Sequence, residues 1–163
     1  EKRQHPVQRL SQVPYILIAL DLPRSSSELR IALRETVRKY RLSYPKSYFT
    51  CLSVLGKLSE TEQLRSVALV SDRQFEMRNW AQPLNIPPGK IRFQVLPGDD
   101  PAAVILDYAR QHMADHIIVG ARANSTLRRF IGSVSTRVVA EASCSVTVVR
   151  PVREAHVRVE AER

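Results

Sequence analysis

The sequence predicts an α/β fold in which five buried parallel strands alternate with four amphipathic helices. Two patterns in the sequence indicate this. Apolar runs such as YILIAL at residues 15–20 are typical of strands covered on both faces. Between these runs, apolar residues recur at helical spacing behind capping residues. Strands that alternate with helices pair in parallel through right-handed crossovers. At 163 residues the chain has the length of one domain with a good core.

The expected strands are short apolar runs that end at residues favouring a turn or a helix start. In chain order they cover residues 15–20, 48–54, 91–96, 117–119 and 145–149. The first ends at Asp21 and the fourth at Gly120, and Pro97 and Pro151 follow the third and the fifth. The domain therefore spans residues 14–150, with a polar tail at 1–13 and a charged tail at 151–163.

Two capping boxes are expected to open the first two helices, Ser25 with Glu28 and Ser59 with Glu62. In this motif the serine and the glutamate each satisfy a free backbone N–H group. The first helix is expected to bury Leu29, Ala32, Leu33, Thr36, Val37 and Tyr40. The second is expected to bury Leu64, Val67, Ala68 and Phe75, and to end by Pro83.

The third and fourth helices have different start signals. Asp100-Pro101 favours a helix start, because aspartate caps N–H groups and proline is tolerated in the first turn. The apolar stripe that follows is Val104, Ile105, Tyr108 and Ala109. The fourth helix is expected to begin at Gly132-Ser133, with Val134, Val138 and Ala142 on its inner face.

The stretch between Gly120 and Ser133 joins a buried strand to a helix N-terminus through a polar, cationic loop. The free N–H groups and the dipole of such a helix point into the loop and attract anions. Glycines at both ends, Gly120 and Gly132, are expected to allow unusual backbone angles and the close approach of a ligand. This spacing favours a phosphate site.

This stretch resembles the C-terminal signature of the universal stress protein family, which is glycine, two residues, glycine, about nine residues, glycine, then serine or threonine. The chain reads Gly120-Ala121-Arg122-Ala123, eight residues, then Gly132-Ser133-Val134-Ser135 and TRVVAEASCSVTVVR. The likeness continues through Gly98-Asp99-Asp100-Pro101, Ala114-Asp115 and Asp21, and it covers roughly residues 14–150. It implies a Rossmann-like open parallel sheet in the order 3-2-1-4-5, with helices on both faces.

In that order the chain reverses direction between the first and fourth strands, and ligands bind in the crevice at such a switch point. Asp21 and Gly120 end those two strands, so two features found separately are expected to lie side by side. The resemblance implies an adenine nucleotide, ATP or a relative, with or without Mg²⁺. The nucleotide-binding residues that it implies are Asp21 and Val54 at the base, Val119 and Gly120 under the ribose and phosphates, and Arg122, Ala123, Gly132, Ser133 and Val134 around the phosphates.

Two alternatives stay open from the sequence. Ala123 stands where the family has its second glycine, and the spacer is one residue short, so a second interpretation is a module with a degraded site that acts through dimerisation or protein partners. Asp21 also fits a plain turn aspartate beside Pro23, and Arg122, Arg128 and Arg129 fit either phosphate pairing or solvated charges.

The sequence favours neither an enzyme nor a nucleic-acid-binding protein. Ser133 has no histidine and acid at the spacing of a hydrolase triad, and the P-loop lysine is missing. The net charge is +9, but the basic residues are dispersed over the tails and over helix faces such as residues 30–41, where they are interpreted as solvated. The histidines are scattered, so no metal site is expected, and no apolar run approaches a membrane span. A cytoplasmic protein is expected.

The fifth strand would be an edge of the sheet, and its sequence SVTVV is rich in β-branched residues. Bare edges favour pairing with another strand, so a homodimer is expected through Ser145, Val146, Thr147, Val148 and Val149. The segments AQPLNIPPGKIRFQVLPGDDPA and YARQHMADHIIVGARA also resemble universal stress protein modules appended to bacterial serine/threonine protein kinases. A kinase domain in a longer chain is the partner which that likeness implies.

Overall fold

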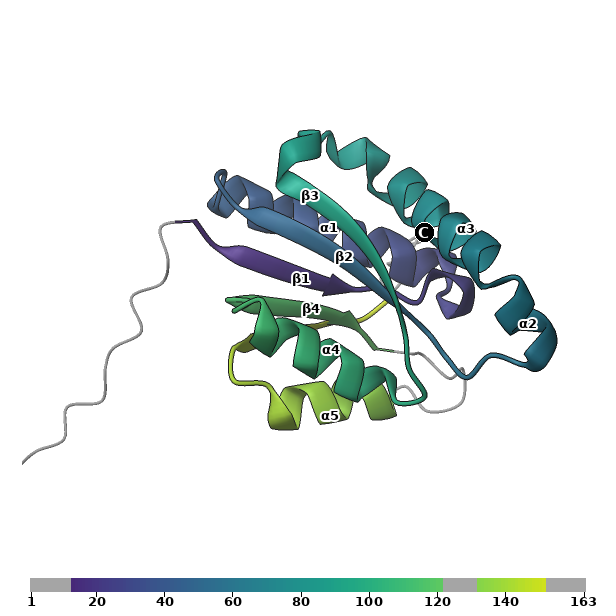
Figure 1. Cartoon of the computed structure of the whole chain (residues 1–163). Helices are drawn as coiled ribbons and strands as arrows, with labels where there is room; N and C mark the ends of the chain where they lie inside the picture. Colours follow the sequence, from purple (N-terminus) through teal and green to yellow (C-terminus); the bar gives the residue numbers. More distant parts are fainter. Residues whose placement is uncertain (1–12, 122–131, 152–163) are drawn as a thin grey trace, which may run out of the picture.

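The structure is a computed structural model that describes residues 13–121 and 132–151. Its centre is a parallel sheet in the order β3-β2-β1-β4-β5, as the sequence and the family resemblance predict (Figure 1). The strands are β1 (Tyr15–Ala19), β2 (Tyr48–Leu55), β3 (Ile91–Pro97), β4 (His116–Gly120) and β5 (Ser145–Val149).

Helices cover both faces of this sheet, α1 and α3 on one face and α4 and α5 on the other (Figure 1). The helices are α1 (Ser27–Ser43), α2 (Glu60–Leu64), α3 (Ser66–Ala81), α4 (Pro101–Gln111) and α5 (Ser133–Glu141). Three short 3-10 turns are η1 (Leu22–Arg24), η2 (Gln82–Leu84) and η3 (Pro88–Lys90). Among the described residues, no helix is both long and apolar enough to cross a membrane.

Strand β1 supplies side chains to two separate cores. Ile16 and Ile18 pack with α1 and α3, and Leu17 packs with α4 and α5. All three are fully buried, and each contributes about 1.5–3 kcal/mol to the free energy of unfolding relative to an exposed side chain. Burial on both faces is the physical reason for the continuous apolar run.

The predicted cap of α1 is wrong by one residue. Ser26, not Ser25, is the N-cap, and its Oγ accepts a hydrogen bond of 3.2 Å from the N–H of Leu29. Ser25 instead donates its hydroxyl to the carbonyl of Asp21 at 2.7 Å. The 3-10 turn η1 lies directly before these serines and sets which of them meets the helix end. The predicted buried face is confirmed for Leu29, Ala32, Leu33 and Val37.

The capping box of Ser59 and Glu62 is confirmed at the start of α2, but the buried face predicted for this region is wrong. Leu64, Val67 and Phe75 are 89%, 83% and 65% exposed. The helix breaks at Arg65 and restarts as α3, whose buried residues are Met77, Trp80 and Ala81. Apolar residues lie all round this region, so their spacing does not define one face.

The starts of α4 and α5 agree with the sequence. Asp100 caps α4 by accepting from the N–H of Ala103 at 3.3 Å, and Pro101 occupies the first turn. Helix α5 begins at Ser133 behind Gly132, with Val138 fully buried on its inner face. Strands β3 and β4 both end at the carboxyl edge of the parallel sheet, and α4 and α5 begin at that same edge (Figure 1).

Candidate functional site

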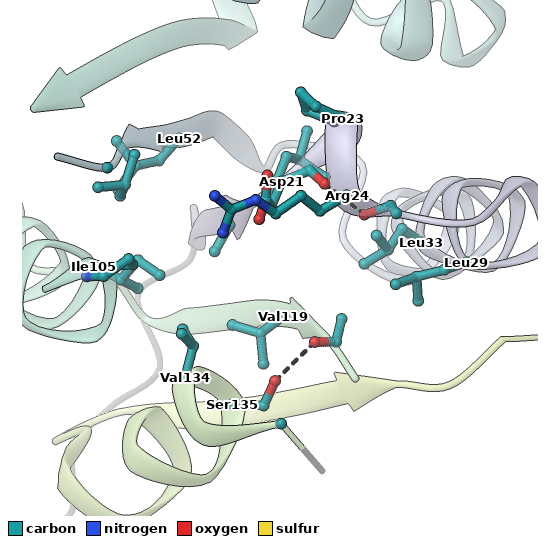
Figure 2. Close-up of a pocket in the computed structure, with 18 of the residues that line it drawn as sticks. Asp21, Pro23, Arg24, Leu29, Leu33, Leu52, Ile105, Val119, Val134 and Ser135 are labelled. Carbon is teal, nitrogen blue, oxygen red and sulfur yellow. Dashed lines mark hydrogen bonds between the residues drawn. The ribbon is translucent and has the colours of Figure 1, made fainter. Parts of the chain in front are cut away.

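A pocket lies at the carboxyl ends of β1 and β4, where the crossover connections run to opposite faces of the sheet. Its walls come from η1, α1, the ends of β2 and β4, and the starts of α4 and α5 (Figure 2). The predicted site residues that line it are Asp21, Val54, Val119, Gly120, Gly132, Ser133 and Val134. The structure thus brings together every predicted site residue that it describes. Arg122 and Ala123, with Arg128 and Arg129, lie outside the described residues.

Asp21 follows the end of β1 and begins the turn η1. The hydroxyl of Ser25 and the N–H of Arg24 both donate to the Asp21 carbonyl, at 2.7 and 3.1 Å. This closed turn holds the half-buried Asp21 at the wall of the pocket. The same backbone geometry would occur in a turn that faces solvent. The position of Asp21 at the pocket wall, and not its turn geometry, therefore favours a binding role over a plain turn aspartate.

Gly120 allows close packing at the end of β4, but not for the reason that the sequence suggested. Among the described glycines none has a positive φ, and Gly132 has a φ of −49°. A Cβ at position 120 would lie 3.0 Å from Cδ2 and 3.2 Å from Cδ1 of Leu29. The expectation of unusual backbone angles at these two glycines is therefore wrong. Position 120 requires a residue without a side chain because Leu29 of α1 packs directly against the end of β4.

Ser135 joins the two halves of the glycine motif. Its hydroxyl donates to the carbonyl of Gly120 at 2.7 Å, and the residue is only 4% exposed (Figure 2). This bond ties the first turn of α5 to the end of β4. Sequence reasoning assigned Ser135 no role, although it stands inside the motif.

The N-terminus of α5 opens toward the pocket. Gly132 is its N-cap and provides no side-chain hydrogen bond, and Gly132, Ser133 and Val134 all line the pocket. The first N–H groups of a helix have no partner within the helix, and the helix dipole adds partial positive charge at this end. This end of the pocket has the chemistry of an anion site.

The rest of the pocket lining combines apolar side chains with two arginines. Leu29, Leu33, Leu52 and Ile105 supply apolar surface, as Figure 2 shows. Arg24 lines the pocket from η1, and Arg73 lines it from α3. The Nη1 of Arg73 donates to Oγ of the buried Ser53 at 2.9 Å. Sequence reasoning missed both arginines, because a single arginine outside a motif carries no signal of what it faces.

Asp100 and Arg137 form an ion pair between the start of α4 and helix α5. Arg137 binds the Asp100 carboxylate, and this hydrogen bond holds the pKa of Asp100 below its usual range. The same carboxylate accepts from the N–H of Ala103. Within residues 13–121 and 132–151 no group of three or more histidine, cysteine or acidic side chains is placed to hold a metal ion.

The fold resembles those of known proteins. The universal stress protein UspA from Lactobacillus plantarum is 24% identical, with a TM-score of 0.66 over 86% of this chain and 99% of its own. A universal stress protein described as a complex with cAMP is 17% identical, with a TM-score of 0.62 over 87% of this chain and 100% of its own. A family protein from Arabidopsis thaliana, described with AMP bound, is 17% identical, with a TM-score of 0.56 over 92% of this chain and 99% of its own. At these identities the likeness shows the fold.

A search of curated proteins found no significant match. The sequence model of the universal stress protein family matches residues 16–150, which is most of the chain and includes both strand ends at the pocket. This chain belongs to the universal stress protein family.

Proposed function

We propose that this protein binds an adenine nucleotide, ATP or a relative, in the pocket between β1 and β4, and that it acts as a binding module in stress response or signalling. One observation carries the proposal. The residues predicted to bind a nucleotide come from β1, β2, β4 and α5, and those that the structure describes all line one pocket.

The two sides of the pocket suit the two parts of a nucleotide. Val54, Leu52 and Ile105 offer apolar surface on which a flat base can lie, and the Asp21 carboxylate accepts hydrogen bonds from an amino or hydroxyl group. On the other side, Ser133 and the N-terminus of α5 supply donors for phosphate. Two solved relatives of the same fold are described with AMP and with cAMP, which supports a nucleotide as the ligand.

Binding, with no catalysis, is the proposed activity. In the described part of the chain, the polar lining residues supply carboxylate, guanidinium and hydroxyl groups, without a histidine or a lysine. Such a set suits the holding of a charged ligand more than proton transfer near neutral pH. The resemblance to kinase-appended modules supports a sensor role, in which nucleotide binding to this module changes the activity of an attached signalling domain.

Ligand-induced stabilisation tests this proposal. A nucleotide present at 100 times its Kd adds about 2.7 kcal/mol to the free energy of unfolding, which raises Tm by about 5–10 °C for a domain of this size. We expect ATP, ADP or AMP to give such a shift. Asp21→Ala is expected to weaken it without changing the Tm of the ligand-free protein. Asp107→Ala is the matched control, because Asp107 is an exposed residue of α4 whose partner is Arg110.

Two results would contradict the proposal. One is the absence of a shift with every adenine nucleotide, which would favour a module that acts only through protein contacts. The other is an equal effect of Asp21→Ala and Asp107→Ala on nucleotide affinity.

We further propose a homodimer through β5. This strand pairs with β4 on one side, and it is the last strand of the described sheet on the other. Light scattering after size exclusion tests the proposal, with Val146→Lys and Val148→Lys together as the variant. Both valines are half-buried, so the thermal unfolding of the variant is measured alongside. A monomer at tens of micromolar, or a folded variant that stays dimeric, would reject this interface.

A further inference from the structure

The proposed function gives no role to two guanidinium groups that line the pocket, those of Arg24 and Arg73. Arg24 reaches from η1 into the space bounded by Leu52, Ile105 and Val119 (Figure 2). Arg73 enters from α3, and Ser53 holds its Nη1 at 2.9 Å. The proposed function assigns the base to the apolar wall and the phosphates to the start of α5, and it leaves both arginines unused.

The charges of these arginines are not neutralised within the described structure. In residues 13–121 and 132–151, no carboxylate lies within ion-pair distance of Arg24 or of Arg73. Asp21 supplies the single carboxylate among the described lining residues, against two guanidinium groups. The described lining therefore has an excess of positive charge, in addition to the partial charge of the α5 N-terminus.

Arg73 and the start of α5 lie beside the ends of different strands. Ser53, which holds Arg73, is near the end of β2, and Gly120, to which Ser135 ties the start of α5, ends β4. Strand β1 lies between β2 and β4. Two interstrand spacings of about 4.8 Å put the two strand ends roughly 10 Å apart. A single cluster of contiguous phosphates at α5 leaves Arg73 facing the base.

A phosphate is a stronger partner for these two guanidinium groups than the ring nitrogens of a neutral base, because its hydrogen bonds with them are charge-assisted. Each guanidinium presents several N–H donors in a rigid fork that matches phosphate, and donors that lose water without gaining an acceptor cost free energy. Resting on the proposed function, we infer that the pocket selects an adenine nucleotide with a second phosphate, attached to the ribose and separate from its 5′-phosphate. Arg73 and Arg24 bind that second phosphate, and the α5 N-terminus binds the first.

Two isomeric ligands test this inference directly. ADP and adenosine 3′,5′-bisphosphate contain the same atoms and the same number of phosphates, and they differ in whether the phosphates are contiguous. Calorimetric titration of both, with the 2′,5′ isomer as a third ligand, is expected to show at least one bisphosphate binding about tenfold more tightly than ADP.

Substitutions then locate the preference. Arg73→Met combined with Ser53→Ala removes the guanidinium without leaving the buried Ser53 hydroxyl unpaired, and it is expected to lower bisphosphate affinity about tenfold while changing ADP affinity little. Arg24→Met is expected to act in the same direction, and Arg73→Lys is expected to keep part of the preference. Arg78→Met is the matched control on α3, because Arg78 lies over the Phe93 ring and outside the pocket.

Each outcome has one meaning. ADP binding as tightly as both bisphosphates overturns the inference and leaves the proposed function standing. A bisphosphate preference that persists in both arginine variants also overturns it. Binding of ATP or AMP without binding of any of these three ligands overturns the inference alone. Absence of binding by every adenine nucleotide overturns the proposed function as well.

Discussion

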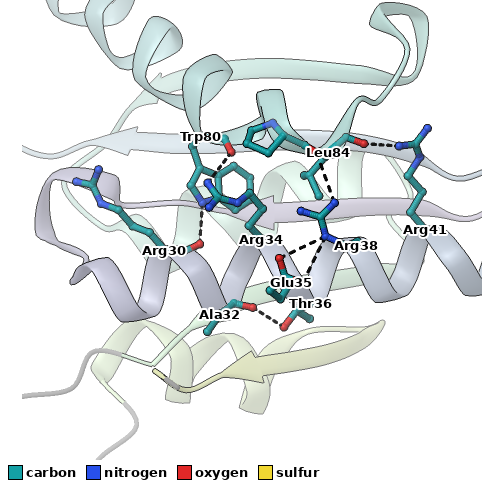
Figure 3. Close-up of polar contacts among 10 residues, drawn as sticks. Arg30, Ala32, Arg34, Glu35, Thr36, Arg38, Arg41, Trp80 and Leu84 are labelled. Carbon is teal, nitrogen blue, oxygen red and sulfur yellow. Dashed lines mark hydrogen bonds and ion pairs between the residues drawn. The ribbon is translucent and has the colours of Figure 1, made fainter. Parts of the chain in front are cut away.

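Two groups of arginines in this molecule carry the same charge in opposite settings. On the outside of α1, Arg34, Arg38 and Arg41 donate to the backbone carbonyls of Trp80, Pro83 and Leu84, respectively (Figure 3). The distances are 3.3 Å from Arg34 to Trp80 and 3.4 Å from Arg38 to Pro83. In the pocket, Arg24 and Arg73 face an open space instead.

The outer row has a structural role. Its acceptors lie at the last turn of α3 and in η2, where helix carbonyls lack partners and the helix dipole is negative. In the other direction, the Nε1–H of Trp80 donates a hydrogen bond of 2.9 Å to the carbonyl of Arg30 in α1. The interpretation of these α1 arginines as solvated surface charges is therefore wrong for Arg34 and Arg41, whose part-buried bonds fasten the end of α3 to α1. The Arg38 side chain is 41% exposed and agrees with it. Among the described residues, no backbone carbonyl accepts a hydrogen bond from the guanidinium group of Arg24 or Arg73. The hydrogen bond of the Arg73 guanidinium is to the Ser53 hydroxyl.

On the proposed binding role of Arg24 and Arg73, the partner of an arginine separates the two groups more than its charge or exposure does. An arginine matched to helix-end carbonyls already uses part of its donors within the folded chain, although the buried Nε of Arg34 has no partner among the described residues. One that lines a cavity without a carboxylate remains available to a ligand anion.

The largest expected effect is on the structural side of the comparison. Trp80→Ala removes a large side chain that is almost fully buried, together with its bond to Arg30. We expect the free energy of unfolding, measured by urea denaturation, to fall by about 3–5 kcal/mol. A loss below about 1 kcal/mol would show that α3 is not held to α1 through this residue.

A smaller loss is expected at the contact between the pocket and α1. Gly120→Ala places a methyl group 3.0 Å from Cδ2 of Leu29, and overpacking of this kind costs about 1–3 kcal/mol. A double-mutant cycle with Leu29→Val measures the coupling, since a shorter side chain relieves the clash. Simple additivity of the two changes would mean that Leu29 is not what excludes a side chain at position 120.

The comparison of the arginines is sharpest when both kinds are changed in the same way. Arg34→Met and Arg38→Met are each expected to lower the free energy of unfolding by about 1 kcal/mol and to leave nucleotide affinity unchanged. Arg24→Met is expected to leave the free energy of unfolding unchanged and to lower the affinity for the adenosine bisphosphate. Urea denaturation and ligand titration on the same samples check both. An arginine of the outer row that alters nucleotide affinity would break the distinction.

The sequence was sufficient for the parts of the fold that depend on local pattern. The strand runs, the Asp100 cap and the Ser59 capping box follow from short-range chemistry, and the structure confirms them. The buried face of α3 could not be predicted, because apolar residues occur on every side of the helix. The break at Arg65 also starts a new helix, so the apolar spacing does not continue from α2 into α3.

The candidate site divides in the same way. Asp21 and Gly120 were predictable, because each ends a strand and the switch point brings strand ends together. Arg73 was not, since it depends on the long-range packing of α3 against the end of β2. The spacing of Arg34, Arg38 and Arg41 indicates a shared helix face, but no local pattern shows that the end of α3 lies opposite.

The smallest expected effect concerns a third kind of arginine. Arg137 is exposed on α5 and pairs with two carboxylates, Asp100 and Glu141. Its hydrogen bond to Asp100 lowers the pKa of that carboxyl. The folded state therefore holds the Asp100 proton less tightly than the unfolded state, whose carboxyl has a pKa of about 3.9. The stability that this pair contributes is present above that value, and it is lost as the pH falls through the lower folded pKa.

Asp100→Asn isolates this charge effect, because asparagine also caps a helix N-terminus. We expect the variant to have a slightly lower Tm than the wild type at pH 6, and the difference to shrink below pH 4 as the wild-type carboxylate is protonated. Thermal unfolding between pH 3 and pH 6 measures it. The pair is solvent-exposed and screened, so 1 M salt is expected to remove most of the difference. A difference that is independent of pH and salt would show that the aspartate acts at this position through its shape and capping bond alone.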